Sequence, residues 1–134
     1  MTPDEANARI SGFFAGAMGL RFVTLEPKRV VAELTVTREL CTIPNVMHGG
    51  AIMAFADTVG AYGAVLNLAD GQGTTTLESK TNFFAAGREG ETVTAEATPL
   101  HIGRRTHVWE TAIRGADGRL IAKVTQTQYV LEAR

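Results

Sequence analysis

The feature that most constrains this chain is a long apolar segment, Ala51 to Ala69, whose only formal charge is Asp57. Its length approaches the roughly 20 apolar residues that cross a bilayer. Gly60, Gly63 and many alanines make the segment only weakly hydrophobic, and an ionised aspartate at the centre of a membrane is costly. The segment therefore predicts a helix over about residues 50–68, buried on nearly all sides inside a protein rather than in a membrane.

The segments around this helix have the composition and alternation of β-strands. Runs rich in Val, Thr, Ile and aromatic residues, bounded by Gly, Pro and Asp, predict strands near 20–23, 30–36, 74–85, 91–102, 106–114 and 119–131. Apolar spacings of three to four predict a short helix over 4–17, and 38–50 is predicted to be a loop. A hairpin, one apolar helix and a four-strand meander predict an α+β fold, with an antiparallel sheet wrapped around a long central helix.

Size and charge narrow the possibilities. The 134 residues fit one domain, 1–134, in which about 1–18 form the flanking N-terminal helix. With 13 basic and 14 acidic residues, no overall field favours nucleic acid or an anionic membrane, and neither is expected as a partner. Cys41 is the only cysteine and the polar start lacks the pattern of a signal peptide, so a cytoplasmic location is predicted.

Asp57 is the most informative residue because an unpaired buried charge costs several kcal/mol. It can have a structural role, capping another element or pairing with an Arg, since structural ion pairs also bury carboxylates. The preceding glycines, Gly49 and Gly50, favour a functional role. At a helix N-terminus they leave backbone N–H groups unobstructed by a Cβ, and the helix dipole there favours negative charge. This pattern predicts an oxyanion hole.

His48 precedes the two glycines, and its role stays open between a general base, a hydrogen-bond donor to a carbonyl and a polar residue near the helix start. Asp57 follows it by nine residues, about two and a half helical turns. The two side chains of one chain are therefore not expected to reach the same small group. This spacing predicts that a second subunit completes the site.

The run from Asn45 to Thr58, NVMHGGAIMAFADT, resembles the signature of the phenylacetate-degradation (PaaI-like) branch of the hotdog-fold acyl-CoA thioesterases. The spacing from the His-Gly-Gly triplet to Asp57 is similar to that of the family. The order of elements, from hairpin through long helix to four strands, also resembles the hotdog fold over essentially the whole chain.

The resemblance implies a role for each residue that matches the motif. Asp57 is the nucleophile or general base, and the backbone N–H of Gly49 or Gly50, from the opposite subunit of a dimer, polarises the thioester carbonyl. A hydroxyl on the first long strand after the helix assists, here Thr76 or the neighbouring Thr75. The resemblance further implies a homodimer or a dimer of dimers, with an acyl-CoA as substrate.

The chain departs from the family pattern at one position of the expected substrate pocket. Family members often carry Asn six residues before the motif histidine, whereas this chain has Thr42 there and its nearest Asn is Asn45. Between the second and third of the late strands, Arg104 and Arg105 resemble the family segment that meets the CoA nucleotide, and Arg suits phosphate. Without that likeness, a charged solvent-exposed turn is the simpler interpretation.

Other chemistries lack their motifs. The sequence has no phosphate-binding loop, no dinucleotide fingerprint, no nucleophile elbow and no zinc-ligand spacing, so neither a cofactor nor a metal is expected. Cys41 is interpreted as a loop thiol. The leading hypothesis is an acyl-CoA hydrolase; a hotdog module that binds acyl-CoA or lipid without hydrolysis is the main alternative, and a hotdog dehydratase is a third.

Overall fold

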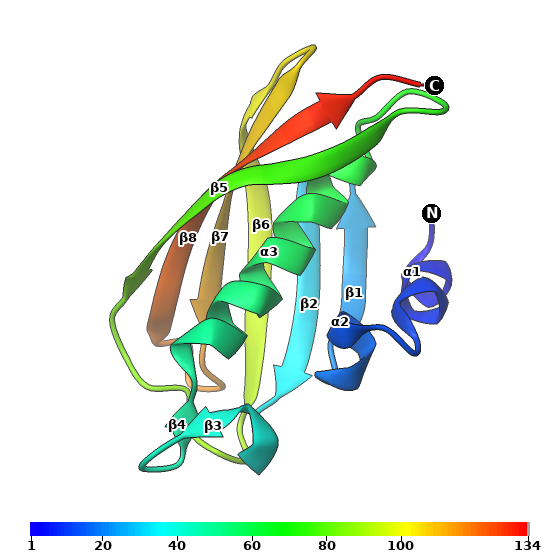
Figure 1. Ribbon diagram of the computed structural model, residues 1–134. Coiled ribbons are helices and arrows are strands. Elements are labelled where there is room, and N and C mark those ends of the chain that lie inside the picture. Colours follow the sequence, from blue (N-terminus) through cyan, green and yellow to red (C-terminus); the bar gives the residue numbers. More distant parts are fainter. Residues whose placement is uncertain (134) are drawn as a thin grey trace.

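The chain forms a six-stranded antiparallel sheet with one long helix across its face, in a computed structural model that describes residues 1–133 (Figure 1). The strands are β1 (Arg21–Glu26), β2 (Arg29–Thr35), β5 (Gly73–Phe83), β6 (Thr92–Ile102), β7 (Thr106–Arg114) and β8 (Leu120–Leu131). The helices are α1 (Pro3–Ile10), α2 (Phe14–Ala17), α3 (Gly49–Val65) and the 3₁₀ turn η1 (Arg38–Leu40). The strand order is β1-β2-β6-β7-β8-β5.

The predicted fold class, an antiparallel sheet with a long central helix, is confirmed, and the predicted strands lie close to the observed ones. The predicted four-strand meander is wrong. Strand β5 does not pair with β6, which follows it in the chain; β5 pairs with β8 at the edge of the sheet, and β6 pairs with β2. The predicted loop over 38–50 is wrong in part, because β3 (Cys41–Thr42) and β4 (Val46–Met47) form a small hairpin there.

The N-terminal segment forms two short helices, not the single helix predicted over about 1–18. Helix α1 begins at a capping box, in which the Thr2 and Glu5 side chains each bond the other's backbone N–H. It ends before Gly12, whose φ of 80° lies in the left-handed region that glycine adopts without strain. The Asn7 side chain joins α1 to β1 by exchanging two hydrogen bonds with the backbone of Phe22.

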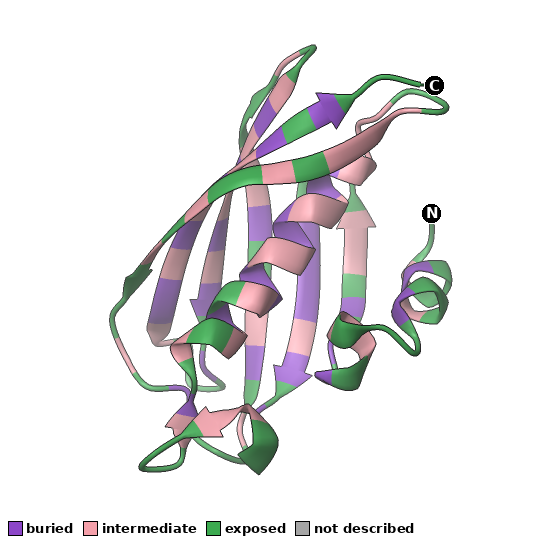
Figure 2. Cartoon of the chain, in the orientation of Figure 1, coloured by how far each residue is buried: buried purple, intermediate pink, exposed green. Residues whose placement is uncertain are grey.

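Helix α3 packs on the sheet through one face. Its buried residues recur at helical spacing: Ile52, Phe55, Ala56, Val59, Gly60, Gly63 and Ala64. A Cβ on Gly63 would lie 2.6 Å from the Trp109 ring, so the missing side chain lets the helix approach the buried indole closely. Figure 2 shows buried positions on the strands behind α3, while its outward turns are half-buried or exposed. The prediction of burial on nearly all sides is therefore wrong for one chain.

No helix among residues 1–133 is long and apolar enough to span a membrane.

Arg119 closes the β7–β8 turn against the start of β6. Its guanidinium donates to Glu91 Oε2 at 2.6 Å, to Asp117 at 2.7 Å and to the Ala86 carbonyl at 2.6 Å. Burial opposes ionisation of Glu91, but hydrogen bonds from Arg119 and from the backbone N–H of Arg88 outweigh it, so the pKa of Glu91 is lowered from its ordinary 4.5. A lowered carboxylate pKa means that ionised Glu91 stabilises the folded state.

We expect Glu91→Gln to lower the free energy of unfolding by about 2 kcal/mol near neutral pH, the scale of a hydrogen bond to a charged group. The Glu91 contribution is fully present above the ordinary pKa and is lost as pH falls through the lowered folded-state value. The difference between wild type and variant should therefore disappear in acid. Urea unfolding across this pH range measures it.

The matched control is Glu96→Gln, because Glu96 forms a more exposed ion pair with Arg29. We expect that change to cost less than about 1 kcal/mol. Equal losses for the two variants at neutral pH would contradict the role assigned to the Arg119–Glu91 pair.

Candidate functional site

Asp57 lies in the middle of α3, half-buried against the sheet. Its Oδ1 accepts a hydrogen bond from the Thr76 hydroxyl at 2.8 Å and another from Gln126 Nε2 at 3.2 Å. No residue among 1–133 donates to Oδ2. The carboxylate is thus anchored through one oxygen, and the other is available to a ligand.

The structure brings Thr76, not Thr75, to Asp57. Thr76 is opposite Gln128 in the β5–β8 ladder, whereas Glu78 is opposite Thr127, so Leu77 is an extra residue in a β-bulge. Side chains alternate along a strand, so Thr76 faces the helix while Thr75 is exposed on the other side. Of the two threonines predicted, the helix-facing one makes the contact.

Gln126 and Gln128 were not predicted as site residues, yet both belong to this cluster. They are fully buried on β8, and Gln128 Nε2 donates to Thr76 Oγ1 at 2.6 Å. The signal available in the sequence is that two amides occupy alternate positions of a strand whose other inward residues, Val124 and Val130, are apolar. That signal identifies buried polar groups without naming their partners.

His48 is the N-cap of α3. Its Nδ1 accepts a hydrogen bond from the Gly50 N–H at 2.8 Å, which places the proton of the neutral ring on Nε2. The Gly50 amide is therefore occupied within the chain. Within the described residues 1–133, the Gly49 N–H has no acceptor, so Gly49 supplies the open donor at this helix end.

Asp57 and the Gly49 amide of one chain are far apart. Asp57 follows Gly49 by eight positions, a helical rise of roughly 12 Å, which is too long for both to contact one thioester carbon. A chain alone thus carries a carboxylate at mid-helix and a backbone N–H without an acceptor among residues 1–133 at the helix start, and the two cannot contact the same group.

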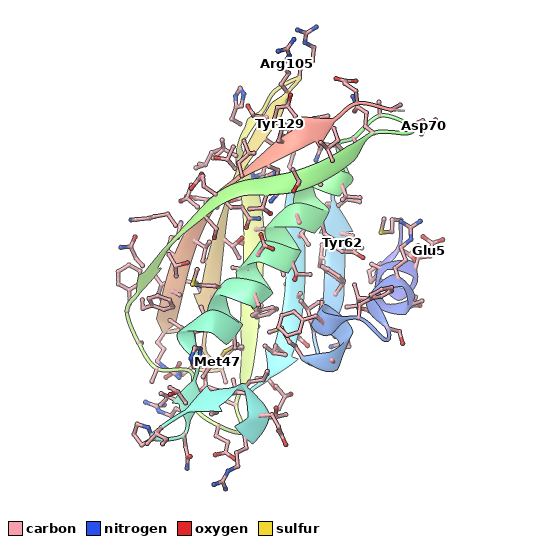
Figure 3. The ribbon with its side chains drawn as sticks, in the orientation of Figure 1. Glu5, Met47, Tyr62, Asp70, Arg105 and Tyr129 are labelled. Atoms are coloured by element: carbon pink, nitrogen blue, oxygen red, sulfur yellow. The ribbon has the colours of Figure 1, made fainter. Side chains whose placement is uncertain are left out.

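The four predicted substrate contacts lie at two ends of the molecule. Thr42 and Asn45 close the β3–β4 hairpin, where the Asn45 N–H donates to the Thr42 carbonyl at 2.8 Å, beside the start of α3. Arg104 and Arg105 are exposed at the tip of the β6–β7 hairpin. Figure 3 shows Arg105 at the opposite end of the chain from Met47, which precedes α3. One chain does not bring these two pairs together.

Among residues 1–133, no cluster of three or more His, Cys, Asp or Glu side chains forms a metal site.

A family model described as the thioesterase superfamily matches residues 44–122, more than half of the chain. The chain belongs to the thioesterase superfamily. The matched region contains the His48-Gly49-Gly50 triplet, Asp57 and Thr76.

Known proteins are similar to this chain over nearly its full length. The chain is 28% identical to the 1,4-dihydroxy-2-naphthoyl-CoA hydrolase of Escherichia coli, covering 98% of this chain and 96% of that protein. The crystal structure of thioesterase HI1161 from Haemophilus influenzae matches with a TM-score of 0.93 and 27% identity, over 98% of this chain and 92% of that one.

The structure of the E. coli PaaI protein from the phenylacetic acid degradation operon has a TM-score of 0.87 at 24% identity, over 97% of this chain and 93% of that one, a likeness of fold. The predicted resemblance to hotdog-fold thioesterases is therefore confirmed. The family and these relatives support thioester hydrolysis as the class of reaction.

In this thioesterase-superfamily chain, we expect His48→Ala to lower the free energy of unfolding by about 1 kcal/mol, because it removes the N-cap of α3. Asn is among the preferred capping residues, so His48→Asn should recover most of that loss. Thermal unfolding of the three proteins checks the expectation. An Asn variant as unstable as the Ala variant would show that His48 does not stabilise the helix by capping.

Proposed function

We propose that the protein hydrolyses an acyl-CoA thioester to a free acid and CoA, with a site that two subunits complete. The observation that carries the proposal is the Asp57 carboxylate, held through Oδ1 with Oδ2 unengaged by residues 1–133, together with the open Gly49 amide at the start of the same helix. The E. coli relative is named as a hydrolase of 1,4-dihydroxy-2-naphthoyl-CoA, which supports CoA as the group that carries the acyl chain.

The chemistry divides between these two groups. Asp57 acts either by attacking the thioester carbon or by taking a proton from a water that attacks it. In both routes the carbonyl oxygen gains negative charge, which the Gly49 N–H and the positive end of the helix dipole stabilise. The C–S bond then breaks, and the CoA thiolate takes up a proton, from Asp57 in the water route or from solvent in the nucleophilic route. In the nucleophilic route, water then hydrolyses the acyl–Asp57 anhydride, which releases the acid and restores the carboxylate. The Gly50 amide, bonded to His48, shapes the helix start without reaching the substrate.

A homodimer follows from the separation of the two groups within a chain. In the described residues, β5 has a strand on one side only, which leaves the backbone groups of its outer edge unpaired. Long edge strands are templates for pairing with another chain. Pairing β5 with the β5 of a second copy would place each Asp57, which Thr76 ties to β5, near the partner's half of the site. A dimer of dimers extends the same proposal.

The remaining predicted contacts are assigned to the substrate. Arg104 and Arg105 are exposed donors that suit CoA phosphates, and Thr42 and Asn45 lie beside the start of α3, where an acyl group would be held. The arginine pair and the Thr42–Asn45 pair lie at opposite ends of one chain. A substrate that spans the subunit interface would contact the arginines of one subunit and the other pair from its partner.

The Gly49 amide can be deleted without breaking the helix. Gly49 is the first helical residue, a position that favours proline, and His48 has φ −60° and ψ 137°, a conformation that residues before proline prefer. We expect Gly49→Pro to fold and to lower kcat about 100-fold or more through loss of one oxyanion donor. A thiol-release assay with an aryl and a short-chain acyl-CoA measures it.

Gly49→Ala is the matched control, since it adds a Cβ but keeps the N–H. That Cβ would lie 3.3 Å from the exposed Phe83 ring, which can give way. Its loss of kcat should be far smaller than that of Gly49→Pro. Equal losses would mean that the new carbon, not the missing N–H, impairs the site.

Complementation tests the shared site. We expect Asp57→Asn to lower kcat by about 10² to 10⁴, as loss of an acid–base group does. When Asp57→Asn and Gly49→Pro chains are refolded together, half of the dimers are mixed and each has one intact site, so about a quarter of wild-type activity should return. No recovery from a mixture that forms dimers would contradict the shared site. Saturable binding of acyl-CoA without thiol release by the wild type would favour the non-hydrolytic module.

A further inference from the structure

Two buried amides lie behind the Asp57 carboxylate. Gln126 and Gln128 are each 0% exposed, although a primary amide is costly to bury unless it is hydrogen-bonded. Gln126 Oε1 has no donor among residues 1–133. Within these residues, the Gln126 side chain therefore makes its hydrogen bonds through its NH₂ group alone.

Gln128 determines the direction of the hydrogen bond between Thr76 and Asp57. Its Nε2 can only donate, so Thr76 Oγ1 accepts at 2.6 Å and the hydroxyl proton remains for Asp57 Oδ1 at 2.8 Å. At the other end of this amide, the Thr74 hydroxyl lies 3.1 Å from Gln128 Oε1 and 3.0 Å from the Tyr129 carbonyl, and it can donate its one proton to either oxygen. Gln128 therefore donates to Thr76, and Thr76 in turn donates to the Asp57 carboxylate.

Gln126 reaches Asp57 from the other side. Its Nε2 lies 3.2 Å from both the Asp57 carbonyl oxygen and Oδ1. With the amide reversed, the partial negative charge of Oε1 would face the negative carboxylate, and the two would repel each other. Gly60, one turn after Asp57, makes room for the amide, since a Cβ there would lie 2.4 Å from Gln126 Oε1. Glycine at position 60 thus lets the Gln126 amide lie beside Asp57.

We propose that Gln126 and Gln128 are positioning residues of the thioesterase site, which orient Thr76 and the Asp57 carboxylate so that Oδ1 is held and Oδ2 reacts. The inference rests on the proposed function, in which Asp57 is the reacting carboxylate. Neither glutamine touches the substrate, and Gln128 acts only through Thr76. The two residues should therefore affect kcat and leave KM nearly unchanged.

A double-mutant cycle on kcat tests the action of Gln128 through Thr76. Gln128→Met and Thr76→Val each remove hydrogen-bonding groups at similar volume, and each should lower kcat roughly tenfold. The double variant should be no slower than the slower single variant. Thr76→Ser, which restores the hydroxyl, should recover most of the loss.

The matched control is Thr111→Val. Thr111 is fully buried on neighbouring β7, and its hydroxyl has no partner among residues 1–133. The kcat of the variant should therefore equal that of the wild type. Circular dichroism and thermal unfolding confirm that each variant folds. Should Gln128→Met fail to fold, Gly60→Ala provides the second test, because its methyl group displaces the Gln126 amide; kcat should fall roughly tenfold with KM unchanged.

The outcomes separate the two proposals. If Asp57→Asn abolishes turnover but the losses of Gln128→Met and Thr76→Val multiply, the glutamine has only a structural role and this inference is overturned alone. A folded Gly60→Ala with wild-type kcat likewise overturns the part assigned to Gln126. If Asp57→Asn keeps full turnover, the proposed function itself is wrong, and the inference fails with it.

Discussion

The structure depends on how a carboxylate is accommodated between a helix and a sheet. Asp57 is half-buried on the otherwise apolar helix α3, and burial of an ionised group requires hydrogen-bond donors. Thr76 from β5 and Gln126 from β8 supply them, so the two strands that close one edge of the sheet are also the ones that hold the candidate reactive group. Correct pairing of β5 with β8 is therefore a condition for the site.

Small residues on α3 make this arrangement possible. Gly60 leaves room for the Gln126 amide and Gly63 for the Trp109 indole, each at a distance that a Cβ would not permit. Glycines inside a helix cost about 1 kcal/mol each relative to alanine. Here that loss is offset by close packing of the helix on the sheet, which brings the Asp57 backbone and side chain within reach of β8.

The start of α3 is built by a different device. His48 caps the helix through the Gly50 amide, and the Gly49 amide has no acceptor in the described part of the chain, residues 1–133. The two glycines therefore do not provide two equivalent donors, because the Gly50 N–H is already bonded to His48. The helix separates this end from Asp57 by roughly 12 Å. The proposed site is for that reason shared between two copies, and the proposal places their contact at the β5 edge.

The sequence by itself determined most of the helices and strands and the residues at the two ends of the candidate site. Alternation along strands, helical spacing and turn residues are local properties, so β7 (Thr106–Arg114) and the long helix are predicted closely, and Asp57, His48 and Gly49 stand out from their immediate neighbours. Only the tertiary structure decided that β5 crosses to β8, that Thr76 rather than Thr75 faces the helix, and that Gln128 bonds Thr76 while Gln126 bonds Asp57. Those facts depend on contacts between residues about 50 to 70 positions apart, which no local pattern records because pairing is selected by the packing of the whole sheet.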